Sequence, residues 1–328
     1  MIIIIIIIII IIIIIIIMKI GVLADCQYAD IPDLHQEGRT QRFREVPQKL
    51  QSALDAMCDC DFIIHLGDII QSQDCPDLTR KELQAICSIF ESCPIPKIHV
   101  LGNHCIGTLP RGNILESLQI PSPGYYSIDL SSSWKCIVLD TTEMSGHSGY
   151  PGDSAQRQEA EAYLEKHPLT SEEPHMVSWN GGITVSQKQW FLQELDKAAS
   201  FDKKVVVCCH HQVNPSAARI SHLAWNFCEI SEVLSAYSSV VKLILSGHDH
   251  IGGGCRETDS NGNVQFFITV PAVLESPRGS NSYMILELAD ATNERNDMED
   301  NQSCISVTGY GSRSVEIIDT LFPCESCR

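Results

Sequence analysis

The sequence is poor in basic residues. It has 23 Lys and Arg against 41 Asp and Glu, which gives a formal net charge of −18 at pH 7. Surfaces that bind nucleic acid are usually basic, because they must neutralise backbone phosphates. The charge balance therefore argues against nucleic acid as a partner held by bulk electrostatics. An anionic substrate would have to be attracted locally, by metal ions.

Linker-like segments and internal repeats are also missing. No tract rich in Gly, Ser and Pro divides the chain, and no segment recurs at a fixed period. The length that follows residue 17 is sufficient for one large hydrophobic core or two small ones. We therefore expect residues 18–328 to form a single domain.

The first seventeen residues lack the features of an export signal. They are a Met followed by unbroken Ile, without a basic region or a cleavage site of small residues. The run is also shorter than the roughly 20 residues that a transmembrane helix needs. We interpret residues 1–17 as a low-complexity segment outside the fold, with Met18 as the working start and a membrane anchor as the weaker alternative. No stable membrane association is expected.

The cysteines do not form the pattern of a disulfide framework. Their number, 15, is odd, and Cys136, Cys208 and Cys209 lie in apolar runs. They are interpreted as reduced, buried thiols of a cytoplasmic protein. Cys324 and Cys327 make a lone C-x-x-C, and without a second pair it does not predict structural zinc.

Short apolar runs that stop at a potential metal ligand recur along the chain. In residues 62–68, for example, an apolar run typical of a buried parallel strand leads to Gly67 and Asp68. Open α/β sheets bind ligands beyond the carboxyl ends of their strands, so we expect the residues that end these runs to meet at one edge. Five runs have this form, and they end at Asp25, Asp68, Asn103, His210 and His248.

Helical patterns separate the first three of these strands. Residues 47–57 carry apolar side chains at helical spacing, with Pro47 in the first turn, and residues 77–90 do the same, with Asp77 as the expected N-cap. This order predicts parallel strands with helical crossovers. Further on, the sequence predicts a hairpin of residues 124–130 with 134–140, and helices over 186–199 and about 225–237.

The helical patterns stop after residue 254. The apolar runs over residues 264–270, 283–288 and 304–307 have no helix between them, so they are expected to form a second, mainly antiparallel sheet. Residues 143 to about 175 are polar and rich in Gly, Ser and Pro, and we interpret them as a surface insertion and candidate lid. Two sheets face to face with helices outside give an α/β fold of four layers, an αββα sandwich of two mixed sheets.

The polar residues at the strand ends fit a site for two metal ions. Two dications about 3.5 to 4 Å apart repel and need an anionic bridge, for which Asp68 is suited. Oxygen ligands combined with imidazoles suit Mn, Fe or Zn better than calcium. A single Asp after a strand is more often a cap or turn former, so the combination carries the argument. Its members are Asp25, Gln27, Asp68, Asn103, His104, His210, His248 and His250.

Three further histidines lie in or beside the same strands. We assign His65, His99 and His211 to packing or to support of the ligands. Periodicity alone does not separate His210 from its neighbour His211, and the preference for His210 depends on the family resemblance that follows.

The order of these motifs resembles the calcineurin-like metallophosphoesterases. The family's D-x-[H/Q], GD, GNH, strand-borne H and GHxH are matched over residues 19 to about 250 by Asp25-Cys26-Gln27, Gly67-Asp68, Gly102-Asn103-His104, His210 and Gly247-His248-Asp249-His250. Other stretches, among them residues 21–30, 180–182 and 223–226, are similar to the manganese-dependent ADP-ribose/CDP-alcohol diphosphatases of that family. In that group Gln replaces the usual His of the first motif, as Gln27 does here.

The resemblance implies a dinuclear centre. One metal would be held by Asp25, Gln27, Asp68 and His250, and the other by Asp68, Asn103, His210 and His248. Mn²⁺ is the favoured ion, with Mg²⁺, Fe and Zn²⁺ as alternatives. A hydroxide bridging the ions would attack phosphorus in line, and His104 would stabilise the phosphorane or protonate the leaving oxygen. Arg42 and Arg44 are candidates for gripping the second phosphate, with solvated surface charge as an equal alternative.

The function implied is hydrolysis of the pyrophosphate bond of ADP-ribose or CDP-alcohols, giving a nucleoside monophosphate and a phosphorylated remainder. The partner implied is a small nucleotide diphosphate. Alternatives are another phosphodiesterase, such as one acting on cyclic nucleotides, and a catalytically silent scaffold that binds proteins. A purple acid phosphatase is disfavoured, because its tyrosinate ligand would fall on Gln71.

Overall fold

The computed structural model describes residues 17–36, 38–289 and 305–321. The predictions for residues 1–16, Cys324 and Cys327 lie outside these ranges. Strand β1 (Ile17–Leu23) includes Ile17, which pairs with Ala289.

The first sheet has the strand order β15-β14-β1-β4-β5. Its β1, β4 and β5 are parallel, as the alternation of strands and helices predicts, whereas β14 runs antiparallel to β1, and β15 to β14. The bounds of its other strands are β4 (Phe62–His65), β5 (Lys97–His99), β14 (Tyr283–Ala289) and β15 (Ile305–Tyr310).

The second sheet has the order β12-β13-β11-β10-β7-β6. The four inner strands are parallel, and the predicted hairpin of β6 with β7 is present at one edge. The bounds are β6 (Tyr126–Asp129), β7 (Trp134–Val138), β10 (Lys204–Cys208), β11 (Val241–Ser246), β12 (Gly253–Thr258) and β13 (Val264–Thr269).

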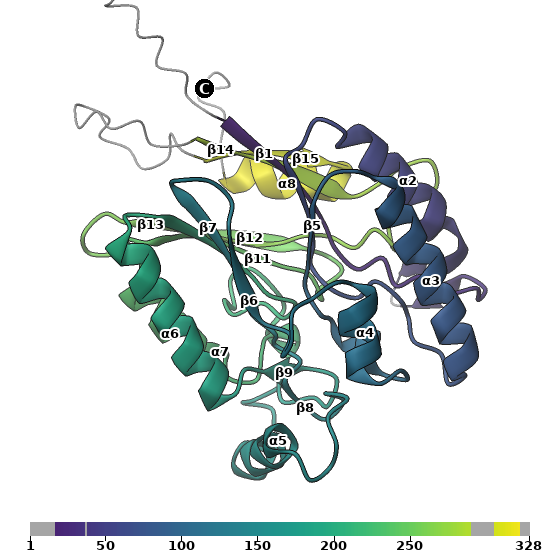
Figure 1. Cartoon of the computed structure of the whole chain (residues 1–328), viewed down its shortest axis with the longest axis horizontal. Coiled ribbons are helices and arrows are strands. Elements are labelled where there is room, and N and C mark those ends of the chain that lie inside the picture. The colour runs from purple at the N-terminus through teal and green to yellow at the C-terminus, as the bar shows by residue number, and fades with distance from the viewer. Residues whose placement is uncertain (1–16, 37, 290–304, 322–328) are drawn as a thin grey trace, which may run out of the picture.

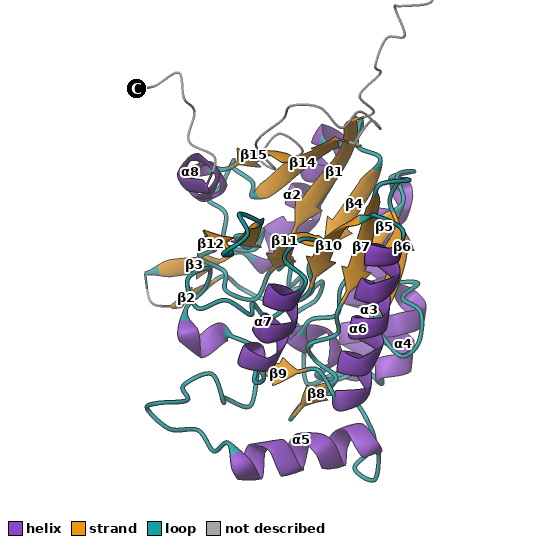
Figure 2. Ribbon diagram, turned by 90° about the vertical axis from the view of Figure 1, so that its left-hand side faces the viewer, coloured by secondary structure: helices purple, strands orange, loops and turns teal. Residues whose placement is uncertain are grey.

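Helices cover the outer face of each sheet (Figures 1 and 2). The first sheet is covered by α2 (Val46–Ala56) and α3 (Pro76–Ser92), and the second by α6 (Val185–Ser200) and α7 (Phe227–Ala236). In β10, Val205 and Val207 pack on the helix side while Val206 and Cys208 face the first sheet, as alternation along a strand requires. The predicted four-layer αββα sandwich is confirmed.

The prediction for the C-terminal strands is wrong. β13 joins the second sheet parallel to β11, and β14 and β15 join the first sheet instead of forming a sheet of their own with β13. The reason is burial: all six residues of β13 are buried, so it is an inner strand, and the half-exposed β12 occupies the edge. A helix, α8 (Ser312–Leu321), follows β15 and packs against β12 and β15.

Two helix starts also differ from the predictions. Cys75 is the N-cap of α3, so Asp77 lies in the first turn. There its negative charge interacts favourably with the positive end of the helix dipole. Helix α6 begins at Val185, one residue before the predicted start, and it is capped by Thr184, whose hydroxyl accepts the Gln187 N–H.

The remaining elements lie near the carboxyl ends of the strands or in the connections. Residues 143–175 hold α5 (Ala155–Lys166), and Ala160 of this helix packs against Trp225 and Met176. No helix within the described ranges is both long and apolar enough to cross a bilayer. The other elements are β2 (Leu34–Gln36), β3 (Arg39–Gln41), β8 (Met144–Ser145), β9 (Gly181–Gly182), α4 (Arg111–Ser117), η1 (Phe43–Glu45), η2 (Asn103–Ile106) and η3 (Ile220–His222).

Candidate metal centre

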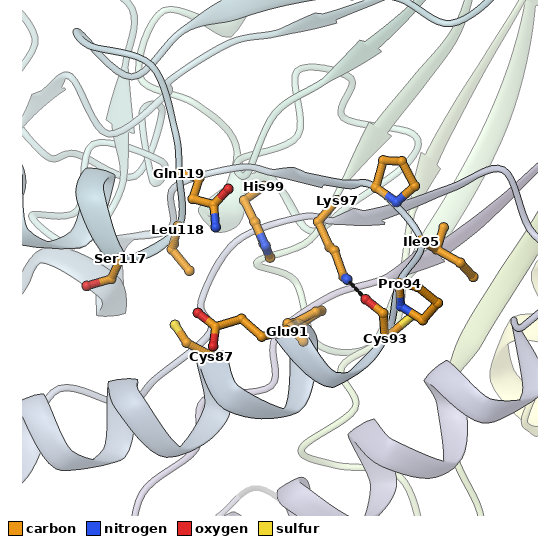
Figure 3. A pocket seen from close by; sticks show the side chains of 12 residues that line it. Cys87, Glu91, Cys93, Pro94, Ile95, Lys97, His99, Ser117, Leu118 and Gln119 are labelled. Atoms are coloured by element: carbon orange, nitrogen blue, oxygen red, sulfur yellow. Dashed lines mark hydrogen bonds between the residues drawn. The ribbon is translucent and has the colours of Figure 1, made fainter.

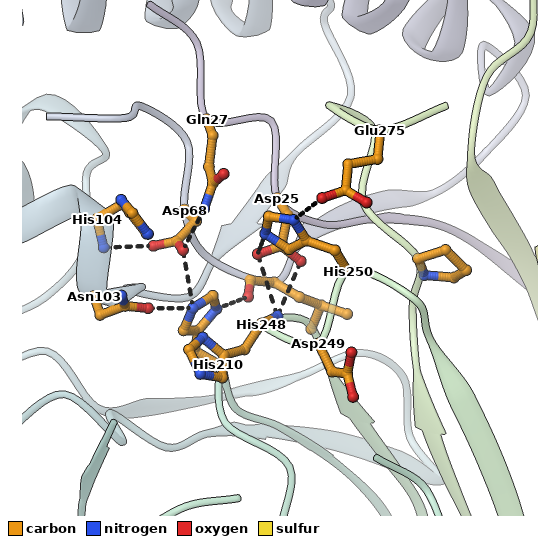
Figure 4. Close-up of polar contacts among 12 residues, drawn as sticks. Asp25, Gln27, Asp68, Asn103, His104, His210, His248, Asp249, His250 and Glu275 are labelled. Carbon is orange, nitrogen blue, oxygen red and sulfur yellow. Dashed lines mark hydrogen bonds and ion pairs between the residues drawn. The ribbon is translucent and has the colours of Figure 1, made fainter. Parts of the chain in front are cut away.

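The predicted ligands meet where the carboxyl ends of the two sheets come together (Figure 4). Asp25, Asp68 and Asn103 follow β1, β4 and β5 of the first sheet, whereas His210 and His248 follow β10 and β11 of the second. Asp25, Asp68 and His210 each offer a ligand atom, and these three atoms all lie within 4.8 Å of one another. The site is therefore assembled from both sheets.

Asp68 lies at the centre of this cluster. Its Oδ2 is 3.2 Å from His210 Nε2 and accepts a hydrogen bond of 3.1 Å from the Gln27 amide. Its Oδ1 accepts the backbone N–H of His104 at 2.8 Å. Asn103 Oδ1 completes this side of the site, 3.0 Å from His210 Nε2. The position of Asp68 among these groups is the one that a bridging carboxylate needs.

Asp25 lies on the other side, beside the two histidines of the GHDH motif. Both of its carboxylate oxygens accept the backbone N–H of His248, at 2.9 and 3.2 Å. Its Oδ1 is 3.8 Å from His250 Nε2. Asp25 and His250 are therefore placed to share one ion.

Neighbouring groups fix which ring nitrogen of His210 and of His248 faces the site. His210 Nδ1 lies 2.8 Å from the Leu66 carbonyl, which can only accept, so Nε2 is left free to face Asp68. Asn180 Nδ2 donates to two backbone carbonyls, which turns its Oδ1 toward His248 Nε2 at 2.7 Å. Nδ1 of His248 is thereby left without a proton, as a ligand nitrogen must be.

Four of the predicted ligands have a left-handed backbone. The φ angles are 51° for Asp25, 44° for Gln27, 55° for Asp68 and 67° for His248. This conformation costs a residue other than glycine about 1–3 kcal/mol, and such residues concentrate at functional sites. The strain turns side chains just past the strand ends back toward one centre.

The glycines of the three motifs leave room for the ligands. A Cβ on Gly67 would collide with the His210 ring, and one on Gly102 would collide with the Asp68 carboxylate. A Cβ on Gly247 would lie 2.7 Å from Asp25 Oδ2. Each glycine is therefore required by the close approach of a ligand from a different strand.

The buried carboxylates of the cluster need compensating positive charge. Burial raises the pKa of Asp25 to about 7, although His250 and His210 oppose this shift. Burial also acts to raise the pKa of Asp68, but His210 and His104 outweigh it and hold that pKa below its usual range. The pKa of His248 is lowered by burial and by the adjacent His211 and His210, so its ring is neutral and can act as a metal ligand. Although burial acts to lower it, Asp68 raises the pKa of His210 to about 9, so in the metal-free protein the His210 ring carries a positive charge that a divalent cation would replace.

His104 and His211 also lie at the cluster. His104 is half-buried, and its Nδ1 is 3.3 Å from the Gln71 carbonyl. His211, which we assigned to packing or support, lies with its ring 4.3 Å from that of His248 and its Nδ1 2.8 Å from Thr141 Oγ1. His65 and His99 pack against Phe90 on the α3 side of the first sheet, as expected of packing residues.

A cavity of about 510 Å³ opens over the cluster. Gln27, Asp68, Asn103, His104, His248 and His250 reach its wall. Sequence reasoning missed four other lining residues, Arg39, Trp179, Arg219 and His222, because none belongs to a motif whose chemistry can be recognised locally.

The structure does not support Arg42 and Arg44 as phosphate contacts. Arg42 Nη1 donates to the backbone carbonyls of Thr40, Glu275 and Ser276, and Arg44 pairs with the exposed Asp30 at 2.6 Å. Neither side chain lines the cavity over the cluster, whereas Arg39 and Arg219 do.

A second cavity, of about 360 Å³, lies between α3, α4 and β5 (Figure 3). His99, Lys97, Cys87 and Cys93 are among its lining residues, but none of the predicted ligands is. The groups that could hold a metal within the described part of the chain all belong to the first cavity's cluster. We therefore place the functional site there.

The fold and this cluster define a dimetal phosphoesterase. The chain belongs to the calcineurin-like phosphoesterase family, whose sequence model matches residues 18–252. It is 32% identical to the manganese-dependent ADP-ribose/CDP-alcohol diphosphatase of Arabidopsis thaliana over 82% of this chain and 90% of that one. The protein of the same name from Oryza sativa is 31% identical over 82% and 87%. A dimetal phosphatase from Danio rerio has a similar structure, with a TM-score of 0.77 and 26% identity over 90% of this chain and 96% of that one.

Proposed function

We propose that this protein hydrolyses the pyrophosphate bond of a nucleoside diphosphate derivative, ADP-ribose or a CDP-alcohol, in a manganese-dependent reaction. The observation that carries the proposal is the buried cluster in which Asp68 lies between ligands from both sheets, under an open cavity. The relatives named above, which act on such substrates by their names, support this choice. The products would be a nucleoside monophosphate and a phosphorylated remainder.

The chain's residues fit two divalent ions, with Asp25, Gln27, Asp68 and His250 at one position and Asp68, Asn103, His210 and His248 at the other. When bound, the ions would stabilise phosphate charge as Lewis acids and lower the pKa of a bound water toward neutrality. Gln27 would offer a neutral amide oxygen where an imidazole is usual, which would make its position a harder one and favour manganese.

His104 is the residue that we assign to proton transfer. Its backbone N–H is tied to Asp68 Oδ1, and its half-buried ring lines the cavity. A ring held beside the bridging carboxylate can donate to a phosphoryl oxygen or protonate the leaving oxygen. In this role it does not bind metal.

The rest of the cavity supplies contacts for the substrate beyond the reacting phosphate. Arg39 and Arg219 line the wall, but they pair with Glu275 and Asp249, so the metal ions remain the main source of uncompensated positive charge. Trp179 is half-buried, with its ring 4.9 Å from that of His222, and it offers a flat surface on which a nucleobase can stack. His147, which belongs to the 143–175 insertion, lines the same cavity, and this supports the prediction that the insertion acts as a lid.

A direct assay tests the proposal. Purified protein loaded with Mn²⁺ should convert ADP-ribose to AMP and CDP-choline to CMP, with the products identified by chromatography. Cyclic AMP assayed beside them tests the alternative of a cyclic-nucleotide phosphodiesterase. Hydrolysis of cyclic AMP alone would contradict the proposal, and turnover of none of the three together with failure to bind metal would favour the protein-binding scaffold.

We place the protein in the cytoplasm. All cysteines within the described ranges are free thiols, including Cys136 and Cys208, whose sulfur atoms lie 3.7 Å apart. Close, unbonded thiols are typical of a reducing compartment.

A further inference from the structure

Glu275 lies in the segment that leaves β13 and is absent from every motif of the sequence. Its side chain is 9% exposed, and its carboxylate contacts two different parts of the site. Oε1 is 2.7 Å from His250 Nδ1, and Oε2 is 3.0 Å from Arg39 Nη1 (Figure 4 shows the contact with His250). One buried carboxylate thus lies between a predicted metal ligand and a cation that lines the substrate cavity.

The hydrogen bond to Glu275 determines the protonation pattern of the His250 ring. An ionised carboxylate can only accept, so Nδ1 of His250 must carry the proton. In the neutral ring the lone pair is then on Nε2, the nitrogen that lies 3.8 Å from Asp25 Oδ1 at the metal centre. A carboxylate placed behind a histidine in this way orients the ring and increases its basicity as a ligand.

The backbone of the same segment holds the neighbouring ligands. Ala272 N–H donates to the His250 carbonyl at 3.1 Å, and Leu274 N–H donates to the Asp25 carbonyl at 3.1 Å. Asp25 and His250 belong to the same one of the two metal positions. The segment 272–275 therefore supports one position and makes none of these contacts with His210 or Asn103 at the other.

We propose that Glu275 is a positioning residue for the metal position formed by Asp25, Gln27, Asp68 and His250, and that Arg39 holds its carboxylate in place. This inference rests on the proposed function only in taking His250 as a metal ligand, and it does not depend on the substrate. Removing the carboxylate should weaken the binding of one of the two ions and leave the affinity for the other unchanged.

The test is the binding of Mn²⁺ to the full-length, metal-free protein, followed by electron paramagnetic resonance and calorimetric titration. Glu275→Gln keeps an acceptor for Nδ1–H but removes the charge, and Glu275→Ala removes both. We expect wild-type protein to bind two ions, and the variants to bind one of them about 10-fold and about 100-fold more weakly, respectively. Glu194→Gln changes a similarly covered carboxylate, which pairs with Lys135 and Lys197 on the α6 side of the second sheet; it is the matched control and should bind both ions as wild type does.

Several outcomes would overturn the inference. One is that Glu275→Gln and Glu275→Ala bind both ions with wild-type affinity. A second is that the variants lose affinity for both ions equally. A third is that the wild-type protein binds no Mn²⁺. Thermal denaturation of the metal-free variants shows whether a loss comes from unfolding, and Glu275→Gln provides the test if Glu275→Ala does not fold. A wild-type protein that binds two ions but hydrolyses neither ADP-ribose nor CDP-choline would refute the proposed function alone.

Discussion

Asp68 Oδ2 and His210 Nε2 lie 3.2 Å apart, although Asp68 follows a strand of the first sheet and His210 a strand of the second. Both side chains are buried, and this contact joins the two halves of the sandwich at the catalytic edge. Removal of the bridging charge should therefore affect both metal positions at once.

Asp68→Asn should lower kcat about 10³-fold or more, because the ions supply several kcal/mol of stabilisation and each 1.36 kcal/mol is a factor of ten. The same variant should retain fewer than two metal ions per chain. Elemental analysis and steady-state kinetics measure the two effects. Full activity of Asp68→Asn would show that Asp68 does not bridge.

Gln27→His should change the metal preference and leave the fold intact. An imidazole in place of the amide oxygen makes the position softer, so the protein should select Zn²⁺ or Fe over Mn²⁺ when loaded from an equimolar mixture. Metal content by mass spectrometry is the measurement, with wild type in the same mixture as the control. An unchanged ratio of metals would mean that Gln27 is not a ligand.

His104→Gln should separate catalysis from metal binding. Loss of the proton-transferring ring should reduce kcat about 10²–10⁴-fold while both ions remain bound, because His104 contacts Asp68 through its backbone and not through its ring. The rate and the metal content should be measured on one preparation. Loss of metal in parallel with the rate would instead make His104 a ligand.

The shifted pKa of His99 leads us to predict how the free energy of unfolding depends on pH. Burial, with a contribution from Lys97, lowers the pKa of His99 to about 4 in the folded state, below the roughly 6.5 of an unfolded chain. Above pH 6.5 the ring is neutral in both states, and its contribution to stability is intact. As the pH falls from about 6.5 to 4, the unfolded chain takes up a proton that the folded chain excludes, so stability is lost.

The corresponding measurement is denaturant unfolding of metal-free protein at pH values between 7 and 4. The free energy of unfolding of His99→Leu should fall less steeply than that of wild type, by up to about 1.4 kcal/mol per pH unit. Parallel slopes for the two proteins would contradict the assignment of His99 as a buried neutral ring.

The sequence predicted those parts of the molecule that local patterns determine. Apolar runs placed β1, β4, β5, β10 and β11, and the residue that ends each run lies at the shared edge of the sheets. The sequence could not predict which sheet β13 joins and which sheet β14 joins. That choice depends on which strands, distant in the sequence, still have a free edge for pairing. Arg39 and Glu275, 236 residues apart, meet only after β13 returns beside β11, and no spacing indicates that contact.

Asn180 is an intermediate case. The Asn180-Gly-Gly182 motif was recognised as a family resemblance, but the role of the amide became clear only from its hydrogen bonds to two carbonyls and to His248. A side chain that orients another has no chemical signature of its own in one sequence.

The most direct test of the account is anomalous diffraction at the manganese edge from crystals of the Mn²⁺-loaded protein. The account predicts two peaks about 3.5 to 4 Å apart on either side of the Asp68 carboxylate, one beside Asp25 and His250 and the other beside Asn103 and His210. A single peak, or peaks away from Asp68, would contradict it.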